Sequence, residues 1–204
     1  MTYTVHALFL TIQGEGANLG RVAVFCRFAG CNLWSGREQD RADAVCRFCD
    51  TEFRGGAKYH SPAALADAAA SLWPGDGPRF LVLTGGEPAL QADTALIDAF
   101  RAQGFTVAIE TNGTVPLKAR PDWVCVSPKA GTRLALAEAD ELKLVFPQPG
   151  AEPERFADFA ATHRWLSPMD GPDLARNIAA AAAYCRSHPG WRLNIQAHKT
   201  WDIP

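Results

Sequence analysis

The chain has 204 residues, of which 48% are hydrophobic and 21% are charged. This composition is ordinary for a globular protein and excludes a largely disordered chain. With 20 basic and 22 acidic residues, the formal net charge is −2, which argues against nucleic-acid binding through bulk positive charge. The apolar runs are too short to cross a membrane, and the first residues lack the basic and apolar segments of a secretory signal. We therefore expect a cytoplasmic protein with one domain spanning residues 1–204.

Short apolar segments alternate with segments of helical periodicity along the chain. Strands are predicted at residues 21–28, 80–83, 105–110, 123–126, 141–146, 164–166 and 193–196. Helices are predicted at residues 61–72, from 88 to about 103, and from 172 through an alanine-rich run to about 185. Most of the strands are continuous apolar runs, as expected for strands that are covered on both faces.

This alternation implies parallel strands joined by right-handed crossovers. Six or seven strands are too few for an eight-stranded barrel. Residues 127–140 have little helical periodicity, and residues 153–161 support at most a short helix. The predicted fold class is therefore α/β: a partial, open β/α barrel of about six to seven mostly parallel strands with a reduced helix complement.

Residues 29–60 form the one long stretch without clear periodicity, and a loop of that length in a compact domain is usually functional. The stretch holds three of the six cysteines, namely Cys31, Cys46 and Cys49. Few cysteines, three of them clustered, favour metal binding in a reducing compartment over disulfides. Three thiolates suit a [4Fe–4S] cluster in which one iron keeps an open position for a chelating ligand. We predict a cluster-binding loop here.

Other interpretations of the cysteines stay open at this point. A zinc site would need a fourth ligand, for which Cys26 and His60 are the candidates. Cys26 alternates with two valines on a predicted strand, which favours a buried core position. Cys125 and Cys185 fall in apolar runs and are also expected to be buried. Three unrelated cysteines are the remaining interpretation.

Two motifs resemble those of a known superfamily. Residues Cys46–Cys49 read Cys-Arg-Phe-Cys, with an aromatic residue directly before the last cysteine. Residues Thr84–Pro88 read Thr-Gly-Gly-Glu-Pro at the end of a predicted strand, where glycines let the backbone approach a ligand. Together they resemble the radical S-adenosylmethionine (SAM) superfamily, whose usual cysteine pattern is Cys-x3-Cys-x2-Cys. The chain departs from this pattern because 14 residues separate Cys31 from Cys46.

Three further polar segments, Glu110–Gly113, Ser127–Lys129 and Ser167–Asp170, also end predicted strands. The chemistry of barrel enzymes collects on this side of the barrel. The resemblance implies that Phe48 lies against the adenine of SAM and that the Gly-Gly-Glu-Pro motif holds its amino group. It implies that Ser127–Lys129 and Ser167–Asp170 supply further contacts to SAM.

Residues in the N-terminal part of the chain narrow the resemblance from the superfamily to one of its families. Residues Gln13–Gly16 read Gln-Gly-Glu-Gly and precede the first predicted strand. Arg27 lies on that strand in alternation with apolar residues and is predicted to point into the barrel, where an arginine is costly unless it is paired. With these residues and the tail Gln196–Lys199, nearly the whole chain resembles the 7-carboxy-7-deazaguanine synthase family of the radical SAM superfamily.

This resemblance implies a carbon–nitrogen lyase of queuosine and 7-deazapurine biosynthesis. The reaction it implies converts 6-carboxy-5,6,7,8-tetrahydropterin into 7-carboxy-7-deazaguanine and ammonia, by a ring contraction that follows removal of a hydrogen atom from C6. It implies a [4Fe–4S] cluster, SAM used catalytically, and Mg²⁺ as cofactors. It assigns no side chain as a certain catalytic acid or base.

The resemblance also assigns the binding residues. The implied metal ligands are Cys31, Cys46 and Cys49 for the cluster and Thr51 for Mg²⁺. The implied SAM contacts are Phe48, Asp50, Gly85, Gly86, Glu87, Ser127, Pro128, Lys129, Ser167, Pro168, Met169 and Asp170. The implied substrate contacts are Ile12, Gln13, Gly14, Glu15, Gly16, Arg27, Thr84 and, through its terminal carboxylate, Pro204.

The partners follow from the same resemblance. They are the pterin, an electron donor such as a flavodoxin, and a second copy of the chain in a homodimer, with no nucleic acid and no membrane. The alternatives are another small radical SAM enzyme, of the glycyl-radical activase type, and a non-enzymatic zinc or iron–sulfur module.

Overall fold

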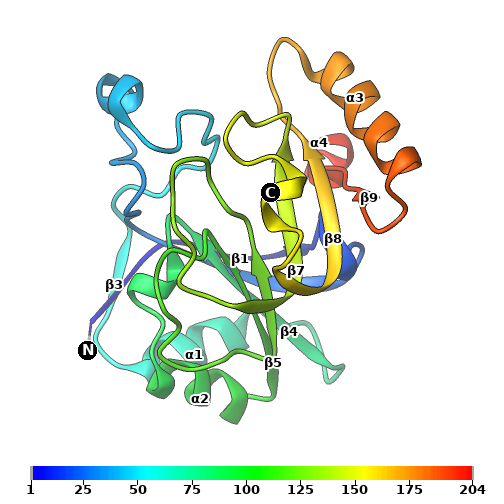
Figure 1. Ribbon diagram of the computed structural model, residues 1–204. Coiled ribbons are helices and arrows are strands. Elements are labelled where there is room, and N and C mark those ends of the chain that lie inside the picture. The colour runs from blue at the N-terminus through cyan, green and yellow to red at the C-terminus, as the bar shows by residue number, and fades with distance from the viewer. Residues whose placement is uncertain (1, 204) are drawn as a thin grey trace.

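A nine-stranded sheet forms the frame of the computed structural model, which describes residues 2–203. The strands lie in the order β3–β1–β2–β4–β5–β6–β7–β8–β9 (Figure 1). Their bounds are Tyr3–Ile12 for β1, Val22–Phe28 for β2, Ala57–Tyr59 for β3, Arg79–Gly85 for β4, Phe105–Thr111 for β5, Trp123–Val126 for β6, Glu138–Phe146 for β7, Ala160–Pro168 for β8 and Arg192–Leu193 for β9.

The helices are few and short. The α-helices are α1 (Pro62–Ser71), α2 (Thr94–Ala102), α3 (Leu174–Ser187) and α4 (Ala197–Trp201), and short 3-10 helices span Gly16–Asn18, Glu38–Asp43, Pro88–Leu90 and Pro153–Phe156. Helices α1 and α2 pack together beside the first strands, and α3 packs on β8 and β9 (Figure 1). Within residues 2–203, no helix has the length and apolar character needed to cross a membrane.

Seven of the strands, β2 and β4 through β9, pair in parallel with their neighbours. They are the seven strands that the sequence predicts. In the part of the chain that the structure describes, no pairing joins the outermost strands β3 and β9, so the sheet stays open. The expected partial, open β/α barrel with a reduced set of helices is confirmed.

Strands β1 and β3 were not expected from the sequence. Strand β1 pairs antiparallel with both β2 and β3, and so extends the barrel at its first edge. Only three of its ten residues are buried, so its apolar residues Ala7–Leu10 lie at half-buried positions, unlike the buried apolar runs that mark the parallel strands. Strand β3 has three residues, too few for a periodic signal.

The second predicted helix begins later than expected. Pro88 opens only a 3-10 turn, and α2 starts at Thr94. The reason is a second cap: the Asp93 side chain accepts a hydrogen bond from the Leu96 amide, a strong helix start. The first helix starts where predicted, with the Ser61 hydroxyl accepting from the Ala64 amide and proline at its first position.

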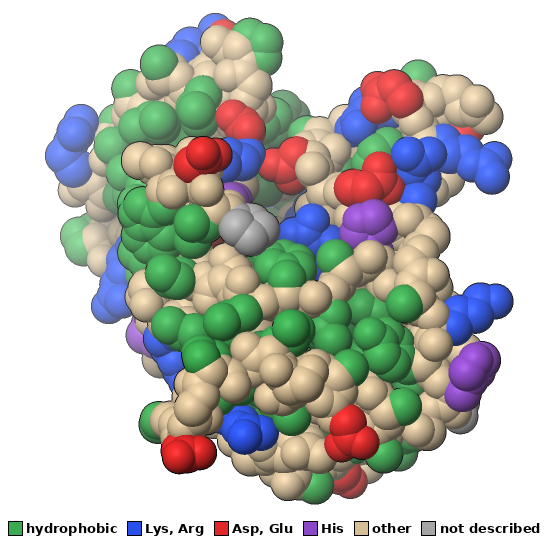
Figure 2. Space-filling view, turned by 180° about the vertical axis from the view of Figure 1, so that it is seen from behind, with side chains coloured by type: hydrophobic (Ala, Val, Ile, Leu, Met, Phe, Trp, Pro, Cys, Tyr) green, Lys and Arg blue, Asp and Glu red, His purple; other side chains and the backbone are tan. Residues whose placement is uncertain are grey.

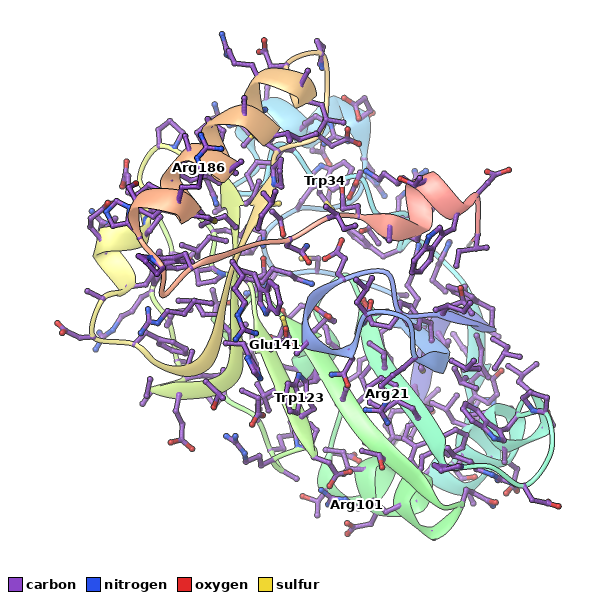
Figure 3. All side chains as sticks on the ribbon, turned by 90° about the vertical axis from the view of Figure 1, so that its right-hand side faces the viewer. Arg21, Trp34, Arg101, Trp123, Glu141 and Arg186 are labelled. Atoms are coloured by element: carbon purple, nitrogen blue, oxygen red, sulfur yellow. The ribbon has the colours of Figure 1, made fainter. Side chains whose placement is uncertain are left out.

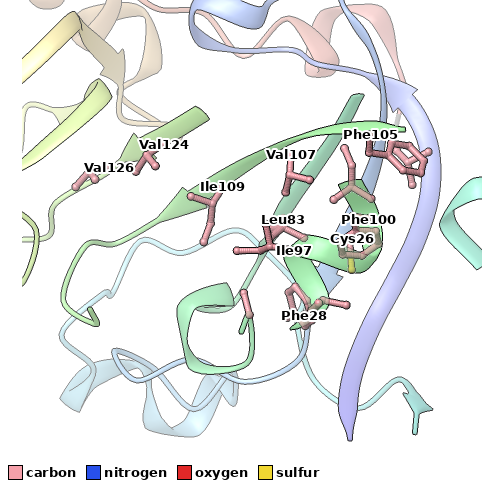
Figure 4. Packing of buried hydrophobic residues seen from close by; sticks show 14 of the residues in the cluster. Cys26, Phe28, Leu83, Ile97, Phe100, Phe105, Val107, Ile109, Val124 and Val126 are labelled. Atoms are coloured by element: carbon pink, nitrogen blue, oxygen red, sulfur yellow. The ribbon is translucent and has the colours of Figure 1, made fainter. Parts of the chain in front are cut away.

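The main hydrophobic core lies between the sheet and the helices. Strand residues that point outward, such as Cys26, Leu83 and Ile109, meet Ile97 and Phe100 of α2 (Figure 4). The alternate residues point to the inner side of the barrel. There a smaller apolar cluster fills the end at which the parallel strands begin, and its members are Ala23, Phe80, Val82 and Ala108, with Phe25 and Trp123 packed against them. The inner side is therefore closed at one end.

Strand register places the polar inner residues next to one another. Arg27 on β2 pairs with Thr84 on β4, Glu110 on β5 pairs with Cys125 on β6, and Cys125 pairs with Glu141 on β7. These residues lie further along their strands than the apolar cluster. The inner face therefore changes from apolar to charged toward the carboxyl ends of the strands.

Candidate active site

A cavity of about 460 Å³ opens at the carboxyl ends of the parallel strands. Between two raised parts of the molecule the surface is hollowed, and charged side chains gather around the hollow (Figure 2). The predicted site residues that line the cavity are Ile12, Gln13, Gly14, Glu15, Arg27, Cys31, Cys46, Phe48, Cys49, Asp50, Thr51, Thr84, Gly85, Gly86, Ser127, Lys129, Ser167, Pro168, Met169 and Asp170. One cavity thus collects residues from nearly the full length of the chain.

The three clustered cysteines all line this cavity. Cys46 and Cys49 influence each other's ionisation, and this interaction lowers the pKa of Cys49 to about 6 and raises the pKa of Cys46. The charge of Cys49 also acts on Cys31. The three sulfurs are therefore neighbours, and one of them ionises readily. Ionised thiolates are the form that binds iron, so this donor set fits the predicted cluster.

The loop that carries the cysteines is held by aromatic and arginine contacts. Trp34 packs edge-on against Phe53, with ring centroids 5.6 Å apart. The Arg41 guanidinium lies 4.1 Å from the centre of the Trp34 ring and donates to the carbonyl oxygens of Arg47 and Cys49. These contacts fix the backbone on both sides of the last two cysteines.

A closed zinc site does not fit the structure. Cys26, one candidate for a fourth ligand, is fully buried in the hydrophobic core, and its burial raises the pKa of its thiol. His60, the other candidate, lies in an exposed hydrogen bond with Thr2. Among residues 2–203, no three His, Cys, Asp or Glu side chains converge on a single ion. A cluster of four irons spreads its thiolates more widely than one ion does.

The glycine motif at the end of β4 packs against the start of the cysteine loop. A Cβ atom on Gly86 would overlap the Gly30 carbonyl oxygen and come within 3.0 Å of the Cys31 side chain. Gly85 has a φ of +121°, a conformation that strongly favours glycine. The motif therefore brings bare backbone into the cavity directly beside a cluster cysteine.

Glu87 in the same motif does not line the cavity. Its side chain is fully buried, and its carboxylate accepts hydrogen bonds from the Ala89 amide, the Thr111 hydroxyl and the Asn112 amide, at 2.7 to 2.9 Å. Burial raises the pKa of Glu87 despite these bonds. Glu87 therefore connects the end of β5 and the loop after it to the glycine motif. The resemblance implied instead that the Glu87 side chain contacts SAM directly.

Replacing Glu87 with alanine is expected to lower the free energy of unfolding by at least about 3 kcal/mol, because three donors lose their acceptor. Urea unfolding followed by circular dichroism measures this loss. Glu138→Ala is the matched control: Glu138 is exposed and pairs with Arg120 at the surface, so we expect a change below about 1 kcal/mol. If Glu87→Ala kept its stability but lost SAM binding, the result would support a direct contact between Glu87 and SAM.

Two other loops bring polar groups to the cavity on the side of β6 and β8. The Lys129 ammonium donates to the Ser127 carbonyl at 2.6 Å and to the Ser127 hydroxyl at 2.8 Å. Burial lowers the pKa of Lys129, and the thiols of Cys46 and Cys49 act in the opposite direction. Pro128, which stands between Ser127 and Lys129 in the sequence, does not line the cavity. A buried cation and a hydroxyl in this position suit the carboxylate of an amino acid.

The loop between β1 and β2 forms another wall of the cavity, but Gly16 lies behind it. Its φ is +68°, and a Cβ atom there would overlap the Glu141 carboxylate. The Gly16 amide donates to Asn194 at 2.8 Å, and the Ala17 amide donates to Glu141 at 2.8 Å. Glu141 in turn accepts from the indole of Trp123 (Figure 3). Gly16 therefore fixes the loop and leaves the cavity wall to Gln13–Glu15.

Arg27 points from β2 into the cavity, as predicted. Its Nε is buried and has no hydrogen-bond partner among the described residues. Burial lowers the pKa of Arg27, while Asp50 and Cys49 act in the opposite direction. A buried guanidinium nitrogen without a partner is costly, and an anionic ligand removes that cost. This unsatisfied donor indicates a carboxylate-binding position.

Of the residues that line the cavity, Lys143 was not predicted from the sequence, and Glu110, Gln196, His198 and Lys199 carried no assigned role. Glu110 belongs to the segment Glu110–Gly113 that was expected on this side of the barrel, and the other three belong to the tail Gln196–Lys199 that contributes to the resemblance. Lys143 interrupts the apolar run of β7, and a lysine at an inward position of a buried strand is the signal that could have found it. The C-terminal residues lie on α4 or directly before it. No local sequence pattern predicts that this helix lies at the cavity.

The C-terminal segment bridges three parts of the site. Lys199 forms ion pairs with Asp50, next to the last cluster cysteine, and with Asp170 after β8. The Gln196 amide donates to Glu15 at 3.1 Å. Pro204, to which a substrate contact was assigned, lies outside the described residues.

Comparisons with known proteins identify the family of the chain. The family model described as "Radical SAM superfamily" matches residues 40–142. The 7-carboxy-7-deazaguanine synthases of Bordetella pertussis and Caulobacter vibrioides are 56% and 55% identical to the chain, each over 100% of both proteins. A structure titled "Crystal structure of QueE from Escherichia coli" superposes with a TM-score of 0.71 at 26% identity, covering 96% of this chain and 94% of that one.

These relatives are neither glycyl-radical activases nor non-enzymatic metal modules, so the alternatives left open by the sequence are set aside. The similarity runs over the whole chain, and more than half of the aligned residues are identical. The chain belongs to the 7-carboxy-7-deazaguanine synthase family of the radical SAM superfamily.

Proposed function

We propose that the chain converts 6-carboxy-5,6,7,8-tetrahydropterin into 7-carboxy-7-deazaguanine and ammonia, with SAM used catalytically, as a step of queuosine biosynthesis. The observation that carries this assignment is the Arg27 Nε, which has no hydrogen-bond partner among the described residues and is buried in a cavity that also presents the carboxylates of Glu15 and Glu110. The proposed substrate has matching chemistry, because it carries a carboxylate at one end and a row of N–H donors at the other.

The side chains of the cavity divide between two ligands. Arg27 can hold the substrate carboxylate through two parallel hydrogen bonds. Glu15 can accept from an amide N–H and an adjacent amine, and Gln13 can both donate and accept. Gly85 and Gly86 offer backbone to SAM. When bound, the [4Fe–4S] cluster and SAM supply the one-electron chemistry that removes a hydrogen atom from the substrate.

The protein contributes position and electrostatics to this reaction. The cavity is closed at one end by the apolar cluster around Phe80 and Val82, so its deep part excludes bulk water. Both ligands are held between the same strand ends, which keeps their reacting atoms adjacent. No side chain of the cavity has to act as an acid or base in the hydrogen-atom transfer.

A direct assay tests this proposal. Protein reconstituted with iron and sulfide is incubated without oxygen with SAM, a reductant and the carboxylated tetrahydropterin, and the products are identified by mass spectrometry. We expect the deazaguanine carboxylate in many turnovers per SAM. Protein that holds its cluster and binds SAM, but yields no deazaguanine, would contradict the proposed substrate.

Magnesium is the third proposed cofactor. Thr51 lines the cavity two residues after Cys49. Mg²⁺ favours oxygen ligands and usually keeps several from substrate and water, so a single protein hydroxyl suits it. We propose that Thr51 holds the ion against the substrate.

Thr51→Ala is expected to reduce the stimulation of turnover by Mg²⁺, because the protein ligand is lost while the substrate oxygens stay. Thr51→Ser keeps the hydroxyl and should respond as the wild type does. The measurement is initial rate against Mg²⁺ concentration for the three proteins. An unchanged metal response in Thr51→Ala would remove this ligand role.

An external electron donor is part of the same proposal. The other cysteines, Cys26, Cys125 and Cys185, pack in apolar surroundings or within the sheet and do not line the cavity. The described residues thus offer no second cluster that could relay electrons. A small electron-carrier protein such as a flavodoxin is the proposed donor. The homodimer and the cytoplasmic location implied by the family stay predictions.

A further inference from the structure

Lys143 joins two carboxylates that belong to distant parts of the chain. Its ammonium lies 2.6 Å from Glu15 Oε2, in the loop after β1, and 2.8 Å from Glu110 Oε2, on β5. Lys143 itself comes from β7 and points to the inner side of the barrel, where it lines the cavity. Within the described residues, Lys143 forms an ion pair with each of the two acidic groups, and the Gln13 amide also donates to Glu110 at 3.4 Å.

The three groups are largely removed from water. Exposed fractions are 10% for the Lys143 side chain, 16% for Glu15 and 22% for Glu110. Two carboxylates in such surroundings disfavour each other's ionisation, and one of them would keep its proton. A cation placed between them reverses this effect at close range. Lys143 is thus in the position required to keep the pair ionised.

The other charged groups nearby are engaged elsewhere or lie at the edge of this trio. The Glu141 carboxylate accepts from Trp123 and from the Ala17 amide. The remaining titratable neighbours are Cys125 on β6, which interacts with Glu110; Lys129 after β6; and His198 on α4, which acts on Glu15. Within the part of the chain that the structure describes, none of these forms an ion pair with Lys143, whose ion pairs are with Glu15 and Glu110.

The pKa directions agree with this geometry. Burial opposes the ionisation of Glu15, but Lys143, together with Gln196 and His198, outweighs it and lowers the pKa of Glu15. Burial raises the pKa of Glu110 even with Lys143 beside it. Burial also works against the charge of Lys143, yet Cys125, Glu110 and Glu15 raise the pKa of Lys143 well above its ordinary value. Without the lysine, both acids would be driven toward the neutral form.

Glu15 is also fixed in orientation. Its Oε1 accepts from the Gln196 amide and its Oε2 from Lys143. A carboxylate offers about four lone pairs, so two acceptor positions stay available to a ligand in the cavity. We propose that Lys143 is a positioning residue: it holds Glu15 ionised and oriented beside Glu110, and thereby selects a substrate edge rich in N–H donors. This inference rests on the proposed function and deepens it.

Lys143→Met is expected to weaken binding of the pterin, and to raise its KM, by about 30-fold or more, because a buried charge-assisted contact is lost. Equilibrium binding of the pterin to reconstituted protein in the presence of SAM is the measurement. Iron content and SAM binding should stay as in the wild type. Lys58→Met, an exposed lysine on β3, is the matched control and should bind as the wild type does.

The pH profile separates this role from a structural one. In the wild type, Lys143 opposes burial and the pKa of Glu15 is lowered, so Glu15 should stay ionised as the pH falls from 8 to 6. In Lys143→Met the pKa of Glu15 rises, so pterin affinity should fall more with falling pH than it does in the wild type. Lys143→Arg keeps the charge and should restore the wild-type profile.

A double variant tests whether Lys143 acts through Glu15. If it does, Glu15→Gln and Glu15→Gln combined with Lys143→Met should lose affinity about equally. Additive losses, a pH-independent loss in Lys143→Met, or wild-type affinity in that variant would overturn the inference. If Lys143→Met does not fold, Lys143→Gln takes its place in the same comparison. A wild-type protein that holds SAM but does not bind the pterin would overturn the proposed function as well.

Discussion

Replacing Arg27 with alanine is expected to reduce turnover of the carboxylated pterin about 1000-fold, because the substrate carboxylate loses a buried, charge-assisted partner. The variant should still assemble its cluster, because Arg27 lies on β2 and donates no hydrogen bond to the cysteine loop in the described structure. Steady-state kinetics with the iron content of each preparation measure both expectations.

Two variants control this experiment. Arg21→Ala removes an arginine just before the same strand; Arg21 stacks on Phe80 and donates to Asn18, at the closed end of the barrel. It should cost stability but keep turnover per folded molecule. Arg27→Lys keeps the charge without the two parallel donors and should recover only part of the activity. Loss of iron from Arg27→Ala would show that Arg27 supports the cluster loop and not the substrate.

Replacing Cys46 with alanine is expected to abolish cluster assembly and all turnover. Cys46 lines the cavity with Cys31 and Cys49, and the remaining two sulfurs cannot hold a cluster that needs three. Visible absorption and iron analysis after reconstitution measure the effect. Cys185→Ser is the matched control, because Cys185 lies on α3 away from the cavity and should load iron as the wild type does. A cluster of full occupancy in Cys46→Ala would refute this ligand set.

The parallel part of the fold follows from local sequence signals. The central parallel strands β2, β4, β5 and β6 are mostly buried and read as apolar runs, and the βα alternation orders the strands. The same order explains why the cysteine loop, the glycine motif and the loops after β6 and β8 could be expected to meet: each follows a parallel strand, and these ends share one edge of the sheet.

Other features depend on contacts that no local pattern reports. Strand β1 carries the apolar residues Ala7–Leu10, but they are only half-buried, and its place at the edge of the parallel strands comes from antiparallel pairing with β2 and β3. Glu87 looks like a ligand in the sequence, but the donors that satisfy it come from the loop after β5. Lys143 finds its partners 128 and 33 residues away, in Glu15 and Glu110. Contacts between residues far apart in the sequence decide whether such a charged side chain stabilises the fold or binds a ligand.

The most direct test of the account is the electron paramagnetic resonance spectrum of the reduced, reconstituted protein with and without SAM. Three cysteines around one cavity predict about four irons per chain. The spectrum should change when SAM is added, because the fourth iron has no protein ligand and can take the amino acid part of SAM. A protein that holds zinc alone, or a cluster whose spectrum is indifferent to SAM, would contradict the account.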